Sequence, residues 1–579
     1  MIRTIIAALL LAGTAQAQTA DQRLKAIYDA EWQWRLAQTG QVQDGLDTKR
    51  GPRLPCETPA CQLERQHYWQ GVLSQLATIP DASLSGEERL NKAVLAESLR
   101  VEVANIGWRA FEMPINSDAN IWQYLPAQAA FRTANEYRNY ISRMRDIPRW
   151  FDEQMAKMRA GLKRGFTPPA ITLKGRDDTL AGQIKPALDS PFYAPFRQMP
   201  SSIPQLEQDE LRAEARAVID TVANPAQTRL LSFLRNDYIP GTRTTTAARD
   251  LPDGMAWYRD QVREYTTTSM TPDAIHALGL QEVARIDADM QATMRAAGFT
   301  GDFKAFLAFL RSDPQFYAKT PNELLGFSAL VMKKMDGKLD QVFTTLPRMR
   351  FTLRPVPDAI APVYTSGRGG LDACYMNTYD LKSRPLYNLV ALTLHECVPG
   401  HSHQAAMALE APARPAFRRR TYFSGYGEGW GLYTEWLGTK LGLYETPYEE
   451  FGRETFEMWR AARLVIDTGL HTRGWSRDQA IAYLEDHTAL SRRDIEVEVD
   501  RYISWPGQAL AYKLGELKIR ELRAKAEAEL GPRFDQRPFH DALLGMGSVP
   551  LPVMEAEMLA WLEREKTKVV PAGAVPAAR

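Results

Sequence analysis

The sequence predicts a large, mainly α-helical fold with one small β element. Three observations favour this fold class. Apolar residues recur three and four positions apart, with charged residues between them, along most of the chain. Several of these stretches begin with helix-start signals, such as Thr271-Pro272-Asp273. Only residues 349–355 and 373–379 look extended, and the second stretch comes just before an apolar run over residues 387–394.

Residues 1–17 have the pattern of a secretory signal peptide. Arg3 supplies the positive start, residues 5–12 the apolar segment, and Ala15-Gln16-Ala17 the small-residue cleavage site. We therefore expect export to the periplasm or the medium, with a mature chain that begins near Gln18. No cysteine follows the expected cleavage site, so we expect no lipid anchor. No later apolar run is long enough to span a membrane.

The length and composition agree with a soluble protein that has a substantial hydrophobic core. The chain has 579 residues, of which 45% are hydrophobic, and its net charge is +1. This balance gives no electrostatic reason to expect a nucleic acid or an anionic membrane as a partner. The sequence does not determine the oligomeric state.

Residues 18–270 are expected to form an N-terminal helical scaffold, part of which could line a substrate site. Residues 271–568 form a second helical region, and we expect the two regions to build one compact unit. The Pro/Ala-rich residues 569–579 are expected to be disordered. The helices predicted in the first region cover residues 23–37, 63–77, 87–104, 134–163 and 206–235. Capping boxes start at Ser85, Thr320, Thr446 and Ser476.

Four cysteines in an exported protein are more often bridged than free. Cys56 and Cys61 are close enough in sequence to close a small loop, and we expect them to pair. Cys374 and Cys397 then remain. Either they form a second bridge, which would tie the extended stretch to the segment that follows it, or Cys397 is a buried apolar residue.

The two extended stretches are separated by residues 367–370, which are expected to form a flexible loop. A strand just before a metal-binding helix can pair with an extended substrate backbone, by accepting it as one more strand. Tyr375 to Asn377 would be that edge, with Tyr375 and Asn377 as substrate-binding residues. Alternatively, the segment is a structural hairpin without substrate contact.

The segment His395-Glu396-Cys397-Val398-Pro399-Gly400-His401-Ser402-His403 predicts a metal site, which we interpret as one zinc ion. His401 lies six residues after His395, roughly 240° around an ideal helix. Pro399-Gly400 can introduce a kink that turns His401 back toward the metal. His403, roughly 80° away from His395 on the same geometry, is the alternative second ligand. We prefer His401, because Pro-Gly has an obvious purpose if the next histidine must be re-aimed.

Glu428 and Glu435 are seven residues apart and share one face of a predicted helix. Two carboxylates in an aromatic and apolar stripe are costly to bury unless they are paired or bind a metal. Glu428 is therefore the expected third ligand. Glu435 is expected to orient a ligating imidazole or to pair with a nearby base. The alternative is an exposed acidic face.

Four stretches together resemble the bacterial domain-of-unknown-function family 885, namely residues 395–404, 428–435, 467–475 and 501–515. The resemblance covers at least residues 271–523. It implies a helical metallopeptidase-like fold with a central cleft, distantly similar in motif logic to carboxypeptidase Taq and dipeptidyl peptidase III. A lone histidine such as His471, expected just after a helix end, is usually structural, but the resemblance also makes it a candidate for a place beside the site.

The last stretch supplies further candidates. Amide hydrolysis develops negative charge on the carbonyl oxygen, which a tyrosine hydroxyl can stabilise, and Tyr512 and Tyr502 are the candidates. Arg501 and Lys513 could bind a substrate carboxylate, and Gln508 shares a helix face with Tyr512. The alternative interpretations are aromatic core packing for the tyrosines and ordinary surface charge for the cations.

These predictions combine into a zinc-dependent peptidase that acts on short peptides. His395, His401 and Glu428 would hold the ion and leave a position open for water. Glu396 would act as general base and pass the proton to the leaving amine. A metal-dependent hydrolase of a non-peptide amide or ester is one alternative, and a non-catalytic periplasmic binding protein is another. The sequence leaves open endo versus exo cleavage and residue specificity.

Overall fold

The computed structural model describes residues 18–44, 47–117, 119–127, 130–358, 360–411 and 414–568. The predicted signal peptide, residues 1–17, and the predicted tail, residues 569–579, lie outside the described residues. Helices dominate the fold and strands are few, so the predicted mainly α class is confirmed. None of the described helices is long and apolar enough to cross a membrane.

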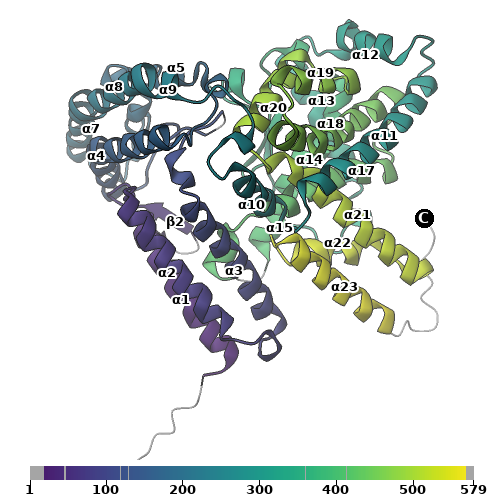
Figure 1. Cartoon of the computed structure of the whole chain (residues 1–579), viewed down its shortest axis with the longest axis horizontal. Coiled ribbons are helices and arrows are strands. Elements are labelled where there is room, and N and C mark those ends of the chain that lie inside the picture. Colours follow the sequence, from purple (N-terminus) through teal and green to yellow (C-terminus); the bar gives the residue numbers. More distant parts are fainter. Residues whose placement is uncertain are drawn as a thin grey trace, which may run out of the picture.

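Helices α1 to α9 lie on one side of the molecule and most of the later helices on the other, with α10 between them (Figure 1). Short π-helical segments join α7 to α8 and α8 to α9, so the predicted helix over residues 206–235 is continuous with two widened turns. The helices of this first part are α1 Ala20–Gln38, α2 Pro59–Ala77, α3 Gly86–Gly107, α4 Ala134–Arg164, α5 Arg176–Ala181, α6 Ala194–Arg197, α7 Gln205–Val218, α8 Asn224–Phe233, α9 Ile239–Gly241 and α10 Gly254–Thr266.

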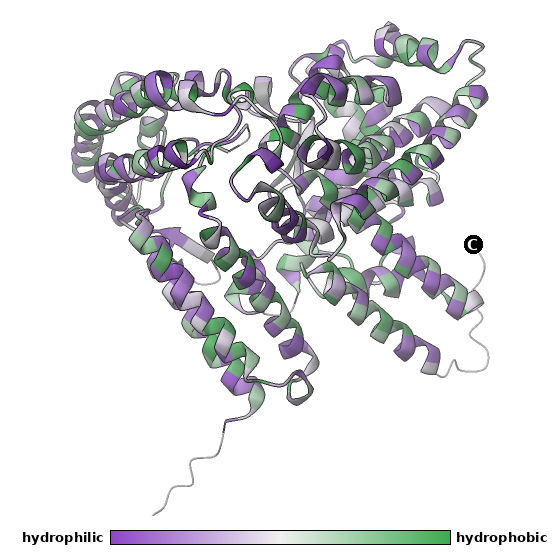
Figure 2. Cartoon of the chain, in the orientation of Figure 1, coloured by the Kyte–Doolittle hydropathy of each residue, from purple (hydrophilic) through white to green (hydrophobic). Residues whose placement is uncertain are grey.

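The second part contains the helices that position the predicted site. Surface helices show hydrophobic and hydrophilic residues on different sides, as expected for elements with one face on a core (Figure 2). These helices are α11 Pro272–Ala296, α12 Phe303–Ser312, α13 Pro321–Asp336, α14 Leu389–Glu396, α15 His401–Glu410, α16 Ala416–Arg420, α17 Ser424–Lys440, α18 Pro447–Arg473, α19 Arg477–His487, α20 Arg492–Ser504, α21 Ala511–Leu530, α22 Gln536–Gly545 and α23 Leu551–Thr567.

Two small sheets complete the fold. Strands β1 (Gln41–Asp44) and β2 (Asp47–Arg50) form an antiparallel hairpin that the sequence analysis did not predict. In the second sheet, β5 (Ala373–Met376) lies between β3 (Thr352–Pro355), which is parallel to it, and β4 (Gly367–Arg368), which is antiparallel.

The prediction that Tyr375 to Asn377 form a free edge is therefore wrong, because β3 and β4 already cover both edges of β5. Part of the predicted flexible loop is itself strand β4. The Asn377 amide is buried and donates to the carbonyls of Ala361, Tyr364 and Thr365, and the Tyr375 hydroxyl donates to Asp372. Both side chains form hydrogen bonds within the protein, so neither has the substrate-binding role that we predicted.

Most of the predicted helix starts have the side-chain cap hydrogen bonds that the sequence predicts. Thr446 and Ser476 form complete capping boxes, and Thr320 accepts a hydrogen bond from the third residue of its helix. Ser85 precedes α3 but makes no side-chain cap hydrogen bond, so only the helix boundary was right there. His471 lies inside α18 and not after its end, because α18 continues to Arg473.

The core of the second part is built around α18, in which every residue from Phe451 to His471 is buried. Helix α11 packs along α18, and α17 packs closely against α21. Glycines permit the second contact, since a Cβ on Gly429 would lie 2.6 Å from the Cα of Gly515. Helix α10 also packs against α17 and α21, and thereby joins the first part to the second.

Both cysteine pairs are bridged. Cys56 pairs with Cys61, as expected, and Cys374 pairs with Cys397. The second bridge ties the central strand β5 to the residue that directly follows α14. The extended stretch and the histidine-containing segment are therefore one covalently linked unit.

Candidate metal centre

The predicted ligands His395 and His401 lie on either side of a complete break in the helix. Helix α14 ends at Glu396 and α15 begins at His401, so the helix is interrupted here, whereas the sequence predicted a kink. Gly400 makes the break possible, because a Cβ at this position would lie 1.8 Å from the carbonyl oxygen of His395. The break brings the ring centroids of His395 and His401 to 4.8 Å from each other.

Glu428, from α17, completes a group of three candidate ligands with these histidines. Its Oε2 lies 3.2 Å from Nε2 of His401 and 3.5 Å from Nε2 of His395. Zinc binds histidine nitrogen and carboxylate oxygen at about 2.0–2.2 Å. Donor atoms at these separations can share one ion, and two imidazoles with one carboxylate are a donor set that zinc commonly takes.

Glu435 lies two helical turns after Glu428 in α17 and fixes the orientation of His395. Its Oε1 lies 2.8 Å from Nδ1 of His395, so that the imidazole presents Nε2 to Glu428. Arg460 lies 3.4 Å from the same carboxylate oxygen, so Glu435 also pairs with a base. Gly431 provides the space for this ring, because a Cβ there would lie 2.7 Å from it.

The electrostatics of the group favour a bound cation. Burial on its own would lower the pKa of His395, but hydrogen bonds to Glu428 and Glu435 raise this pKa to about 9. Burial would raise the pKa of Glu428, yet the two histidines hold this pKa well below its ordinary value. The donor set therefore attracts positive charge, which a divalent ion can supply in place of protons.

Glu396 is held beside the ligands by the turn that follows β4. Its Oε2 accepts a 2.6 Å hydrogen bond from the Gly369 amide, and the Gly370 amide donates to the hydroxyl of Ser402. A side chain at Gly369 would not fit, since its Cβ would lie 2.5 Å from the Cβ of His401. The glycines before the motif therefore position the predicted base, a role that the sequence analysis did not find.

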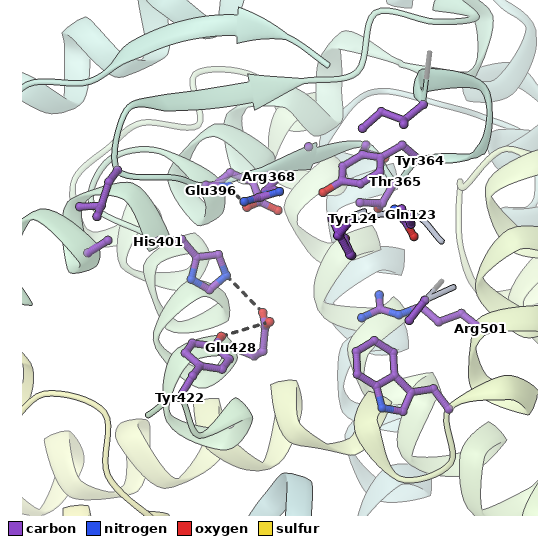
Figure 3. A pocket seen from close by; sticks show the side chains of 18 of the residues that line it. Gln123, Tyr124, Tyr364, Thr365, Arg368, Glu396, His401, Tyr422, Glu428 and Arg501 are labelled. Carbon is purple, nitrogen blue, oxygen red and sulfur yellow. Dashed lines mark hydrogen bonds and ion pairs between the residues drawn. The ribbon is translucent and has the colours of Figure 1, made fainter. Parts of the chain in front are cut away.

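The three candidate ligands and Glu396 lie on the wall of a cavity of about 1440 Å³. Residues from 119–126 and 176–197, in the first part of the chain, form one wall. Strand β4 and helices α14 to α18, α20 and α21 contribute to the others. Figure 3 shows His401 and Tyr422 both directed at Glu428, with Arg501 extending from the opposite side. The cavity is thus shared between the two predicted regions.

A family model described as "Bacterial protein of unknown function (DUF885)" matches residues 40–558. The chain belongs to the DUF885 family. The match includes all three candidate ligands and Glu396. Curated proteins give no significant match.

Two solved structures share the fold of this DUF885 chain. One is described as the crystal structure of the putative lipoprotein from Colwellia psychrerythraea, with 27% identity and a TM-score of 0.85, covering 94% of this chain and 100% of that chain. The other is described as a putative lipoprotein of unknown function from Shewanella oneidensis, with 17% identity and a TM-score of 0.68, at the same coverage of both chains.

Tyr512 lies at the site of the DUF885 chain, whereas Tyr502 does not. Tyr512 lines the cavity, and its ring centroid lies 6.3 Å from that of His395. The hydroxyl of Tyr502 is buried away from the cavity, where Trp459 and Arg463 donate to it at 2.7 and 3.0 Å. The prediction of Tyr502 as a catalytic donor is wrong, because its side chain is buried and does not line the cavity.

Of the predicted substrate-binding residues, Arg501 alone lines the cavity. Its Nη2 donates to Oε1 of Gln508 at 3.0 Å and to the Tyr512 hydroxyl at 3.4 Å. Gln508 is buried behind it. Lys513 is fully buried in a cluster with the carboxylates of Glu282, Glu457 and Glu516, so its predicted contact with substrate is wrong.

The alternative histidines lie outside the ligand group. His403 is buried against the ring of Phe343, and burial lowers its pKa to about 4. Nδ1 of His471 accepts from the Ala248 amide, and its Nε2 donates to the carbonyl of Tyr502. The structural interpretation of His471 is therefore the right one, and His401 is the histidine that shares Glu428 with His395.

Tyr422 is a site residue that the sequence analysis missed. It lies between α16 and α17, and its hydroxyl donates to Oε1 of Glu428 at 3.3 Å (Figure 3). The side chain is 55% exposed although it contacts a candidate ligand. An exposed tyrosine six residues before Glu428 carries no distinctive spacing, so no sequence signal separated it from the other tyrosines.

Proposed function

We propose that the chain is an exported zinc-dependent peptidase with a metallopeptidase-like fold, in which residues 18–270 and 271–568 form one unit around a central cleft. The observation that carries the proposal is the meeting of two imidazoles, a shared carboxylate and a separate glutamate on the wall of one large cavity. A structural site would have its ligands enclosed, whereas a catalytic site must leave one side open to substrate.

His395, His401 and Glu428 would hold the ion, with Glu435 keeping His395 in the correct tautomer. Zinc, when bound, would polarise the scissile carbonyl and lower the pKa of its water to about 7. Glu396 takes a proton from the attacking water and delivers it to the leaving amine. The Gly369 amide, which donates to Glu396 at 2.6 Å, keeps this carboxylate in place.

Tyr512 is the proposed donor to the developing oxyanion. Its ring is fixed by the guanidinium of Arg463, which lies 4.3 Å from the ring centroid, and its hydroxyl is held by Arg501. A hydroxyl that is already oriented loses little entropy on reaching the transition state. Tyr422 is the second candidate, because its hydroxyl also faces the ligand group.

Two other functions use the same residues. A metal-dependent hydrolase of a non-peptide amide or ester would need the same ion and base, and a panel of substrates separates it from a peptidase. A periplasmic binding protein has no use for Glu396, which counts against that alternative. Similarity to proteins described as putative lipoproteins supports a place in the cell envelope or outside the cell.

The decisive experiment compares hydrolysis of a mixed peptide library by the mature protein and by Glu396→Gln, each with and without a chelator. We expect chelator-sensitive cleavage by the mature protein. Glu396→Gln should retain its zinc but lose at least a hundredfold in kcat, because general base catalysis supplies about 10²–10⁴-fold. The exposed Glu64→Gln is the matched control. Full activity of Glu396→Gln would exclude this role.

A further inference from the structure

The cavity carries far more positive charge than the molecule as a whole. Ten arginines and one lysine line it, against five acidic side chains. The whole chain, in contrast, has 71 basic and 70 acidic residues. A cleft with an excess of one sign attracts ligands of the opposite sign.

Most of the acidic side chains in the cavity are already engaged. Glu396 and Glu428 belong to the metal centre. Glu498 is paired with Arg463 at 2.8 Å, and Asp178 with Arg235 at 2.9 Å. The fifth, Asp189, is exposed on the wall formed by the first part of the chain. The cavity is thus poorly equipped to hold the ammonium group of a peptide amino terminus.

The cationic wall nearest to the metal centre is formed by α18 and α20. Arg463 stacks on Tyr512, and Nη2 of Arg501 lies 3.4 Å from the Tyr512 hydroxyl. Arg460 lies beside Glu435, the partner of His395. Nη1 of Arg463 and Nε of Arg460 are buried without a hydrogen-bond partner among the described residues.

The cavity also presents apolar surface, which a small inorganic anion would not use. Large apolar side chains are exposed on its lining, and a peptide chain can bury them. These residues are Tyr124, Ile360, Leu371, Leu409 and Tyr422.

We propose that the wall of Arg460, Arg463 and Arg501 binds the C-terminal carboxylate of a peptide, so that the proposed peptidase removes residues from the carboxyl end. The proposal rests on the proposed function for its chemistry. Guanidinium groups recognise carboxylates through paired N–H donors. Tyr512 lies next to both Arg501 and the His395 ring, so a carboxylate on this wall brings the last peptide bond toward the metal centre.

Three acetylated peptides of one apolar sequence test this assignment. The first has a free C-terminal carboxylate, the second a C-terminal amide, and the third an amide with glutamate as its last residue. We expect the free acid to exceed both amides by about thirtyfold or more in kcat/KM, as for loss of a buried charge partner. Equal turnover of acid and amide overturns the proposal. Recovery by the glutamate amide also overturns it, because recognition then belongs to acidic side chains.

Binding to zinc-loaded Glu396→Gln, measured by calorimetry, separates this proposal from the peptidase function. Tighter binding of the free acid by about thirtyfold without cleavage of any peptide by the mature protein would support carboxylate recognition and overturn peptide hydrolysis. Chelator-sensitive cleavage with equal binding of acid and amide would support peptide hydrolysis and overturn carboxylate recognition.

A matched pair of variants on α20 tests the wall itself. Arg501 remains 18% exposed and lines the cavity, whereas Arg492 is an exposed residue at the start of the same helix. Arg501→Gln should reduce the preference for the free acid about tenfold, because a neutral amide cannot form the charged pair, while Arg492→Gln should keep the preference. An unchanged preference in a folded Arg501→Gln variant overturns the role of Arg501. If that variant does not fold, the comparison of acid and amide on the natural chain still decides.

Discussion

Gly431 is the residue whose size bears most directly on the ligand geometry. A Cβ at this position would lie 2.7 Å from the His395 ring, closer than real Cβ contacts. Gly431→Ala should displace the ring from Glu428 and weaken zinc binding at least tenfold, by about 1.4 kcal/mol or more. Competition with a chromophoric chelator measures the affinity.

Gly326→Ala is the matched control for this change. Gly326 lies within α13, and nothing lies within 4 Å of a Cβ added there. Helix propensity alone should stabilise this variant by about 0.5–1 kcal/mol, with zinc affinity unchanged. Equal zinc affinity in both variants would show that the His395 ring does not need the space beside Gly431.

The candidate ligands could be predicted from the sequence because the histidines, the glutamates and Pro399-Gly400 form a rare combination with fixed spacing. The residues around them could not. Gly369 reaches Glu396 through a backbone amide, and Tyr422 reaches Glu428 from an irregular segment. The first contact joins residues 27 positions apart, and the second depends on the irregular backbone that precedes α17. Neither contact has a residue pattern of its own. The predicted roles of Tyr502 and Lys513 were wrong because residue type does not show that a side chain is buried among structural partners.

At the scale of elements, helix positions follow from periodicity and capping, whereas strand partners do not. Thr446 and Ser476 mark their helices correctly because an N-cap interaction is local in sequence. The order β3-β5-β4 places β5 in the centre, although the intervening residues suggested a loop and a free edge. Pairing of short strands is decided by tertiary packing, which the local sequence does not encode.

The bridge between Cys374 and Cys397 links β5 to the end of α14, beside Glu396. Replacing both cysteines by alanine should lower the free energy of unfolding by about 3 kcal/mol. This is the stabilisation expected for a bridge that joins residues with a sequence separation of 23. The replacement should also weaken zinc binding, because the segment between His395 and His401 loses its anchor. Chemical denaturation and chelator competition measure the two effects.

Removal of the Cys56–Cys61 bridge provides the comparison. This bridge spans a sequence separation of 5, against 23 for the other, and lies in the first part of the chain. We expect a smaller loss of stability, about 2 kcal/mol, and unchanged zinc affinity. If both double variants bound zinc equally well, the bridge at α14 would have no part in holding the site.

At the scale of the whole molecule, the cavity joins segments more than 300 residues apart in sequence, from 119–126 to 501–512. His471 is one of the contacts that hold these parts together, because it links the Ala248 amide to the Tyr502 carbonyl. Periodicity could predict the helices on each side of this junction. The sequence analysis expected that part of the first region could line a site, and this region does contribute a cavity wall. Periodicity could not predict which of its residues do so, since they form no motif.

His471 should make stability depend on pH. Burial lowers its pKa to about 3 in the folded chain, whereas the unfolded chain titrates near its ordinary value of about 6.5. Between these values only the unfolded chain binds the proton, so this residue's contribution to stability is lost as the pH falls from about 6.5 toward 3, by up to about 1.4 kcal/mol per unit.

His471→Gln isolates this contribution, because glutamine does not titrate. The variant should be less stable than the natural chain at pH 7, and the difference in unfolding free energy should narrow toward pH 5. Urea denaturation at several pH values measures the difference. A difference that stays constant with pH would mean that His471 is not held neutral in the folded protein.

The central claim is that one divalent ion binds to His395, His401 and Glu428. The most direct measurement is the zinc content and zinc affinity of the purified mature protein, compared with those of His401→Ala and His403→Ala. We expect one ion per chain in the natural protein and in His403→Ala, and a loss of at least a hundredfold in affinity, about 2.7 kcal/mol, in His401→Ala. Absence of bound metal in the natural protein, or equal affinity in His401→Ala, would contradict the assignment of the site.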